Sequence, residues 1–190
     1  MTTIPTIPKE LETERLVLRM PKPGDGAVVN AAIRASINEL KSWMPFAQTV
    51  PTVEETEINT VEAHLNFLKK TVLRYLIFDK ETGQFIGSTG FHNIDWEVPK
   101  LEIGYWLDTR ASGRGYVTEA VQRLTQLALD GFCCKRVEIQ CEVENTASRK
   151  VAEKAGFQLE GILRNDELSA DGERITDTCI YAVVADRNSY

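Results

Sequence analysis

The chain has 190 residues, and its 22 Lys and Arg against 28 Asp and Glu give a formal net charge of −6 at pH 7. This length suits one domain with a sizeable core, so we expect a single domain over residues 1–190, with a loose lead-in over residues 1–12. The acidic balance argues against a nucleic-acid-binding protein, because no basic surplus is available to neutralise phosphates along a strand.

Several other classes of protein are disfavoured by local patterns. The stretch "MTTIPTIPKELETERL" has neither a basic region nor an apolar region of the kind found in signal peptides. The longest apolar run, "CIYAVVA" at 179–185, is too short to span a bilayer. The cysteines show no CxxC spacing, and His64 and His92 are isolated in the sequence. We therefore expect no metal site and no membrane partner, and we expect reduced thiols in a cytoplasmic protein.

The chain begins with a strand and a helix. In "RLVLRM" at 15–20, apolar and polar side chains alternate, which predicts a strand. Asp25 then predicts the N-cap of a helix that runs to about Leu40.

A second helix and three strands follow. Thr52, with Glu55 three residues later, forms a capping-box pattern that predicts a helix at about 53–71. The next strands are so closely spaced that they predict an antiparallel meander. These strands are expected at 73–79, 84–95 and 101–108.

In the second half of the chain, helices and strands alternate. Apolar residues at helical spacing predict a helix at 117–132, and "RVEIQCEV" at 136–143 predicts a strand. The segment "NTASRKVAEKAGF" predicts a helix closed by Gly156. Two strands near 158–164 and 174–184 flank "SADGER", which predicts a hairpin turn. The element order predicts an α+β fold, with about seven strands in a mixed, mostly antiparallel sheet and one late βαβ crossover.

The segment "WLDTRASGRGYVTEA" at 106–120 places two glycines between a strand and a helix. Gly113 and Gly115 would let a phosphate approach free N–H groups at the helix start, and Arg110 and Arg114 would add charge-assisted contacts. A purely structural strand–helix turn explains this fragment equally well.

Two other phosphate-binding motifs do not fit this segment. A Walker loop requires Lys and then Ser or Thr after its last Gly, where Tyr116 and Val117 stand. A dinucleotide fingerprint requires a third Gly where Thr118 stands.

The segment Arg110-Ala111-Ser112-Gly113-Arg114-Gly115 matches the acetyl-CoA loop Arg/Gln-x-x-Gly-x-Gly/Ala, and the chain here resembles the Gcn5-related N-acetyltransferases. "ENTASRKVAEKAGF" resembles a second element of that family, and "LEIGYWLD" and "YVTEA" are similar to its Rim-type branch of ribosomal-protein N-terminal acetyltransferases. The resemblance covers about residues 11–185. It implies one acetyltransferase domain with three α/β/α layers, in which strands 101–108 and 136–143 splay apart.

The resemblance also implies which residues hold acetyl-CoA. A bulge near Trp106 and Leu107 would open a slot for the pantetheine arm, and the alternative for Trp106 is a core-filling residue. Asn145 would bind the same arm, but it is also a good helix N-cap. The residues expected to bind the cofactor are Trp106, Leu107, Arg110, Ser112, Gly113, Arg114, Gly115, Tyr116, Asn145 and Ser148.

Acetyl transfer to an amine requires an acid for the departing thiolate and a base for the amine. By resemblance, Ser148 is the acid, and either Glu102 or Glu167 is the base. Each carboxylate is explained equally well as a solvated surface charge or an ion-pair partner. Weaker candidates for the base are Tyr105, Asp166 and His92.

The resemblance therefore implies an acetyl-CoA-dependent N-acetyltransferase in which the amine attacks directly, and the favoured acceptor is a protein N-terminal α-amine. One alternative is a small amine such as a polyamine, an aminoglycoside or an amino-acid-like toxin. Another is a CoA-binding module without turnover. The aromatic segment "SWMPF" at 42–46 would wall the acceptor cleft or form a small apolar cluster. Relatives are often dimers, so a homodimer is one expectation.

Overall fold

A computed structural model describes residues 4–185. Its sheet has eight strands in the order β1-β2-β3-β4-β5-β6-β8-β7. The strands are β1 (Glu10–Glu12), β2 (Leu16–Arg19), β3 (Leu73–Asp79), β4 (Phe85–Asp95), β5 (Lys100–Leu107), β6 (Arg136–Glu142), β7 (Gln158–Leu168) and β8 (Ile175–Val184). Neighbours are antiparallel except β5 and β6, which are parallel. The predicted mixed, mostly antiparallel α+β sheet is therefore confirmed.

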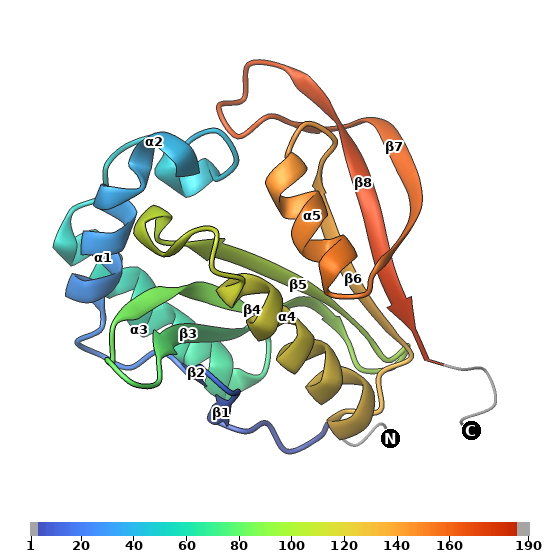
Figure 1. Cartoon of the computed structure of the whole chain (residues 1–190), viewed down its shortest axis with the longest axis horizontal. Coiled ribbons are helices and arrows are strands. Elements are labelled where there is room, and N and C mark those ends of the chain that lie inside the picture. Colours follow the sequence, from blue (N-terminus) through green and yellow to red (C-terminus); the bar gives the residue numbers. More distant parts are fainter. Residues whose placement is uncertain (1–3, 186–190) are drawn as a thin grey trace.

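Helices cover both faces of this sheet, which gives the expected three layers (Figure 1). The helical elements are α1 (Gly26–Ala35), α2 (Ile37–Leu40), η1 (Pro45–Ala47), α3 (Val53–Lys69), η2 (Thr109–Ala111), α4 (Tyr116–Gln126), the π-helical turn η3 (Leu127–Gly131) and α5 (Thr146–Lys154). Helices α1 and α3 pack on one face, and α4 and α5 pack on the other. Over residues 4–185, no helix combines the length and the apolar character that a membrane crossing requires.

The alternation of side chains along β3 shows how one strand serves both faces. Leu73, Tyr75 and Ile77 belong to the larger core, which also contains the apolar face of α4. Leu76 points the other way, into a smaller core with residues of α1. Because successive side chains on a strand point to opposite faces, the helix layers are positioned by this pattern.

Two local predictions of helix ends are confirmed. The Thr52 side chain accepts a hydrogen bond from the Glu55 amide at 3.1 Å, and the Glu55 carboxylate accepts one from the Thr52 amide at 2.7 Å. Gly156 follows α5 with φ of 93°, a left-handed conformation that glycine adopts without a Cβ penalty.

The beginning of the chain is more ordered than the sequence predicts. Residues 10–12 were expected in a loose lead-in, but they form β1 and pair with Val17–Arg19. Leu11 is only 5% exposed and belongs to the larger core. With β1 the sheet has eight strands, where about seven were expected. The sequence did not predict β1 because three residues are too few to show an alternating pattern.

Asp25 does not cap α1 with its side chain, contrary to the prediction. Its carboxylate instead accepts two hydrogen bonds from Arg19, both of 2.7 Å, and one from the Lys22 amide. The start of α1 is capped from α3, where the Glu57 carboxylate accepts a hydrogen bond from the Gly26 amide at 2.7 Å. The expected single helix to Leu40 is also divided, because α1 ends at Ala35 and α2 begins at Ile37.

We predict that Asp25→Asn destabilises the protein by about 1–3 kcal/mol at pH 7, because the bidentate charge-assisted bond to Arg19 is lost. Burial raises the pKa of Asp25, but Arg19 and the Lys22 amide outweigh it, so the folded pKa lies below the ordinary value. The stabilisation is therefore complete above the ordinary pKa of about 3.9 and is lost as the pH falls through the folded pKa.

Denaturant unfolding of both proteins between pH 7 and pH 2 measures this difference. Asp166→Asn, at an exposed position of β7, is the matched control and should leave the free energy of unfolding unchanged. A loss in Asp25→Asn that does not depend on pH contradicts the role given to its charge.

Candidate functional site

Strands β5 and β6 are paired at one end and separate at the other. They pair only where Lys100–Glu102 meet Arg136–Glu138. Beyond this point, β5 stays paired with β4 as far as Leu107, and β6 stays paired with β8 as far as Glu142 (Figure 1). The predicted splay is therefore confirmed, and among residues 4–185 no strand pairs with the β6-facing edge of β5 after Glu102.

The family resemblance implied that a bulge near Trp106 and Leu107 opens the slot. The structure shows no such bulge in the pairing of β4 with β5. The β4–β5 pairing runs without a shift from Gly87 opposite Leu107 to His92 opposite Glu102, and its irregularity lies beyond His92. A Cβ at Gly87 would collide with the backbone of residues 106–107. The strands β4 and β5 therefore stay closely paired here, and the slot opens where β5 and β6 diverge.

The loop before α4 has the conformation that only its glycines tolerate well. Gly113 and Gly115 have φ of 75° and 78°, in the left-handed region that strains other residues. Gly115 is the N-cap of α4, and no side chain caps this helix start. Residues 112–115 are exposed, so the first-turn N–H groups and the positive end of the helix dipole face outward. The loop can bind an anion there.

Arg15 holds this loop in place from the start of β2. Its guanidinium donates to the Arg114 carbonyl oxygen at 3.0 Å and lies 4.8 Å from the centre of the Tyr116 ring. It also forms a 2.6 Å ion pair with Glu119 in the first turn of α4. Burial raises the pKa of Glu119, but hydrogen bonds from Thr13 and Arg15 outweigh it and keep the group ionised. Arg15 thus offsets the one negative side chain in the first turn of α4.

The basic residues near the loop have different environments. The Arg110 guanidinium forms an ion pair of 2.5 Å with the Asp108 carboxylate. The Asp108 side chain is only 1% exposed. Arg114 is exposed. Lys154 of α5 lies with Arg15 and Gly115 around a hollow of about 390 Å³ beside the loop. A cation from α5 therefore stands next to the anion-binding amides.

Ser148 and Tyr105 connect the two sides of the splay. The Tyr105 hydroxyl lies 2.9 Å from the Ser148 hydroxyl and donates to the Ser148 carbonyl oxygen at 3.0 Å. Burial raises the pKa of Tyr105, so its hydroxyl stays protonated and cannot act as a base. The Asn145 side chain accepts from the Ser148 amide at 3.0 Å, which makes Asn145 the N-cap of α5.

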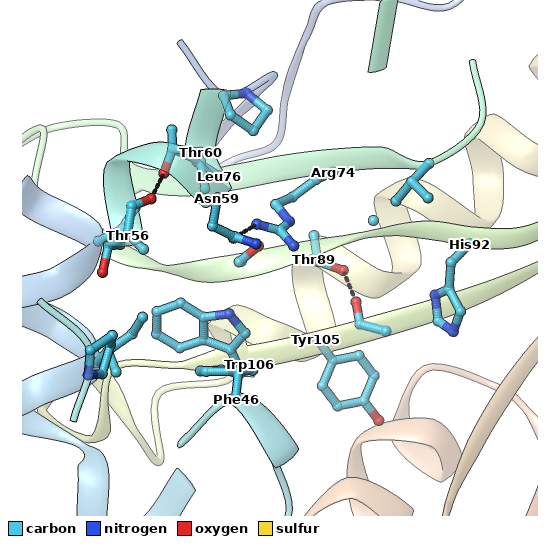
Figure 2. A pocket seen from close by; sticks show the side chains of 18 of the residues that line it. Phe46, Thr56, Asn59, Thr60, Arg74, Leu76, Thr89, His92, Tyr105 and Trp106 are labelled. Atoms are coloured by element: carbon cyan, nitrogen blue, oxygen red, sulfur yellow. Dashed lines mark hydrogen bonds between the residues drawn. The ribbon is translucent and has the colours of Figure 1, made fainter. Parts of the chain in front are cut away.

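A cavity of about 460 Å³ lies on the opposite face of the sheet, between the strands and helices α1 and α3 (Figure 2). Its floor includes Gly90 of β4 and Gly104 of β5, which are paired neighbours without side chains. Trp106 and Phe46 form an aromatic wall, with ring centres 6.1 Å apart. Trp106 also packs against Phe85 in the smaller core, so it serves both the core and the cavity. Neither Trp43 nor Pro45 of "SWMPF" lines the cavity.

Glu102 lies next to this cavity, in contact with His92, which lines it. Its carboxylate contacts His92 Nε2 at 3.1 Å and accepts a hydrogen bond from the Asn93 side chain at 2.8 Å. Burial raises the pKa of Glu102, but His92 and Asn93 together outweigh it, so the group is ionised at neutral pH. A Cβ on Gly104 would lie 3.0 Å from His92 Cε1, which shows that the ring lies over Gly104.

Glu167 and Asp166 are exposed on β7 and do not line the cavity. The charge of Glu167, with those of Glu144 and Asp171, acts on Glu142 at the end of β6. Burial and these carboxylates raise the pKa of Glu142 despite the nearby Arg174. The two candidate bases therefore lie in different places, Glu102 beside the cavity against His92 and Glu167 on the edge strand.

The sequence did not clearly predict two residues that line the cavity. His92 was a weak candidate because it looked isolated, yet the β4–β5 register places it directly opposite Glu102. Arg74 on β3 was not singled out, although it lines the cavity and donates to Asn59 of α3 at 2.7 Å. An arginine among apolar residues of a predicted strand was the available signal for this site.

Comparison with known proteins gives consistent matches. A family model described as an acetyltransferase (GNAT) domain matches residues 15–158. The protein named "Uncharacterized N-acetyltransferase p20" from Bacillus licheniformis is 39% identical over 174 residues, which are 92% of this chain and 95% of the relative. The ribosomal-protein-serine acetyltransferase of Escherichia coli (strain K12) is 31% identical over 145 residues, 76% of this chain and 77% of the relative.

Solved structures similar to this chain are also acetyltransferases. The microcin C7 self-immunity acetyltransferase MccE, in complex with acetyl-CoA and AMP, superposes with a TM-score of 0.87 at 25% identity, covering 94% of this chain and 98% of that one. RimL, a ribosomal L7/L12 α-N-protein acetyltransferase in complex with coenzyme A, has a TM-score of 0.82 at 28% identity, with 93% and 97% covered.

The bracing role of Arg15 leads to a prediction that needs no ligand. Arg15→Met removes the bond to the Arg114 carbonyl and the ion pair with Glu119, so amide hydrogen exchange across residues 113–119 should become faster. The loss of stability should be about 1 kcal/mol, since the pair is partly exposed. Lys150→Met, at an exposed position of α5, is the control. Unchanged exchange in the loop of Arg15→Met would show that Arg15 does not hold it.

Proposed function

This chain belongs to the acetyltransferase (GNAT) family, and on that premise we propose that the loop 112–116 and the slot between β5 and β6 hold acetyl-CoA, while the cavity holds the amine. The chain is an N-acetyltransferase, and acetyl-CoA is the donor that this family uses. The observation that carries the proposal is the unpaired edge of β5, which leads from the loop to Ser148.

The residues present suit the donor's chemistry. The exposed first-turn amides of α4 would bind the diphosphate, with Arg15 and Lys154 nearby as cations. The free edge of β5 beyond Glu102 offers backbone groups that would pair with the amides of the pantetheine arm. Gly113, Gly115 and their neighbours thus act through the backbone, and Arg110 acts mainly by holding Asp108.

Ser148, with Tyr105 beside it, would protonate the thiolate that leaves in the reaction. The Ser148 hydroxyl would donate a proton to the departing sulfur and regain one from solvent, while the Tyr105 hydroxyl, 2.9 Å away, orients it. A thiol titrates near pH 8.5, so a weak acid is sufficient for this step. Asn145 would support Ser148 by fixing the start of α5.

His92 and Glu102 form the base in this proposal. The ionised Glu102 carboxylate would orient the His92 ring through Nε2, and Nδ1 would take the proton of the amine over Gly104. Glu102 is then a positioning residue rather than the group that receives the proton. Glu167 stays the rival base on the grounds of sequence resemblance.

For the acceptor, we favour a protein N-terminal α-amine of the ribosomal-protein type. Support comes from the ribosomal-protein-serine acetyltransferase at 31% identity and from RimL at 28%. The alternative, a small amine such as a polyamine, an aminoglycoside or an amino-acid-like toxin, draws support from MccE at a TM-score of 0.87. A CoA-binding module without turnover would need only the loop and the slot. The cytoplasmic location and the homodimer stay predictions from the sequence.

We predict that the purified protein, given acetyl-CoA, acetylates the α-amine of short peptides. Separate panels of peptides and of small amines, followed by thiol release and mass spectrometry, measure this preference. Peptides blocked at the α-amine but carrying lysine are the control for side-chain transfer. Turnover confined to small amines overturns the peptide assignment, and CoA binding without any turnover supports the binding module.

The base assignment predicts different effects for two matched variants. Glu102→Gln should lower kcat/KM by about 100-fold, because the His92 ring loses its charged partner. Glu167→Gln should stay within about twofold of the unsubstituted enzyme, since Glu167 is exposed outside the cavity. Steady-state kinetics with one peptide measures both variants, and CoA affinity controls for folding. The opposite order of effects places the base on β7.

A further inference from the structure

The Arg74 side chain lines the acceptor cavity and forms no close ion pair with a carboxylate of residues 4–185. Its guanidinium has five N–H donors, and the one contact seen is the 2.7 Å bond from Nη1 to the neutral Asn59 side chain. Burial lowers the pKa of Arg74 and the more distant Glu62 carboxylate acts in the opposite direction, but an arginine stays charged in proteins in either case. The cavity wall therefore carries a partly desolvated positive charge.

Two other arginines of the sheet are neutralised within the chain. Arg19 pairs with Asp25 at 2.7 Å, and Arg136 pairs with Glu160 at 2.5 Å and also with Glu138. Buried charges cost free energy unless they are paired, so an unpaired one beside a cavity calls for a ligand with the opposite charge. The remaining donors of Arg74 suit a carboxylate or a phosphate, which a guanidinium binds with two parallel hydrogen bonds.

The strand register relates Arg74 to the reacting centre. Arg74 lies opposite Gly90 on β4, and Gly90 lies opposite Gly104 on β5. Adjacent strands are about 4.8 Å apart, so the Arg74 backbone is about 10 Å from Gly104, a distance that its long side chain partly spans. His92 lies two pairs further along the strands, on the same face of the sheet. Figure 2 shows Arg74 in the middle of the cavity, with Trp106 and Phe46 on one side and His92 on the other.

We propose that Arg74 binds an anionic group, a carboxylate or a phosphate, that the acceptor carries beside its amine. This inference rests on the proposed function, because it takes the cavity as the acceptor site. The amine lies at Gly104 beneath His92, and the anion lies on the Arg74 guanidinium a few ångströms away. The two glycines of the floor leave the space between them open.

The inference narrows the substrate class. An amino-acid-like small molecule fits through its own carboxylate or phosphate, and a peptide fits if an acidic side chain stands at its first or second position. Polyamines and aminoglycosides do not fit, because they would place a second cation against Arg74. Arg74 is in this view a specificity-determining residue rather than a catalytic one.

Matched acceptors that differ in one charge test this assignment. The peptide arm compares Asp with Asn and Glu with Gln at the first two positions, and the small-molecule arm compares amino acids with their amides. The unsubstituted enzyme should favour the anionic member of at least one arm by about 10- to 100-fold in kcat/KM, since a hydrogen-bonded charge contributes about 1.5–3 kcal/mol. The arm that shows the preference identifies the source of the anion.

Variants at position 74 test whether the preference for anionic acceptors depends on Arg74. Arg74→Met should abolish the preference between the members of a pair, and Arg74→Lys, which keeps the charge but not the paired donors, should keep part of it. Arg164→Met, at an exposed position of β7, should retain the full preference. Thermal unfolding and CoA titration check that each variant is folded.

Equal turnover of charged and neutral acceptors by the unsubstituted enzyme overturns the role of Arg74 and leaves acetyl transfer intact. A preference that survives in Arg74→Met also overturns it. Absence of turnover on every acceptor overturns both this inference and the proposed function.

Discussion

The site depends on a strand that is paired on one edge and open on the other. β5 is held by β4 as far as Leu107, but β6 leaves it after Glu102. Backbone N–H and C=O groups without partners cost free energy when water is excluded from them, so the open edge favours a ligand that supplies the missing hydrogen bonds. The same divergence gives room for Ser148 of α5 to meet Tyr105 of β5. One topological feature thus opens the proposed ligand slot and brings Ser148, the proposed proton donor, beside it.

Charge is distributed locally in a way that the net charge of −6 conceals. Anion binding is assigned to backbone amides at the start of α4, where Arg15 offsets Glu119 and Lys154 stands nearby. On the other face of the sheet, Arg74 and the Glu102–His92 pair give the cavity both signs of charge. An acidic protein can therefore present two separate positive positions, here proposed to serve one reactant each, and remain acidic elsewhere.

Much of the fold could be predicted because its signals are local. The capping box at Thr52, the left-handed Gly156 and the alternation along β3 each depend on residues close in sequence. Distant pairings could not be predicted, because periodicity does not say which strands or side chains meet. Glu57 caps α1 from α3 in place of Asp25, and Arg15 braces a loop about a hundred residues away. His92 looked isolated for the same reason, since only the β4–β5 register places it on Glu102.

A crystal structure with bound CoA measures the central geometry most directly. We expect phosphate oxygens within hydrogen-bonding distance of the amides of residues 113–116, the pantetheine arm along the free edge of β5, and the sulfur beside the Ser148 hydroxyl. Phosphates bound away from the loop before α4, or a sulfur that does not reach Ser148, would contradict the assignment of the slot between β5 and β6 as the donor site.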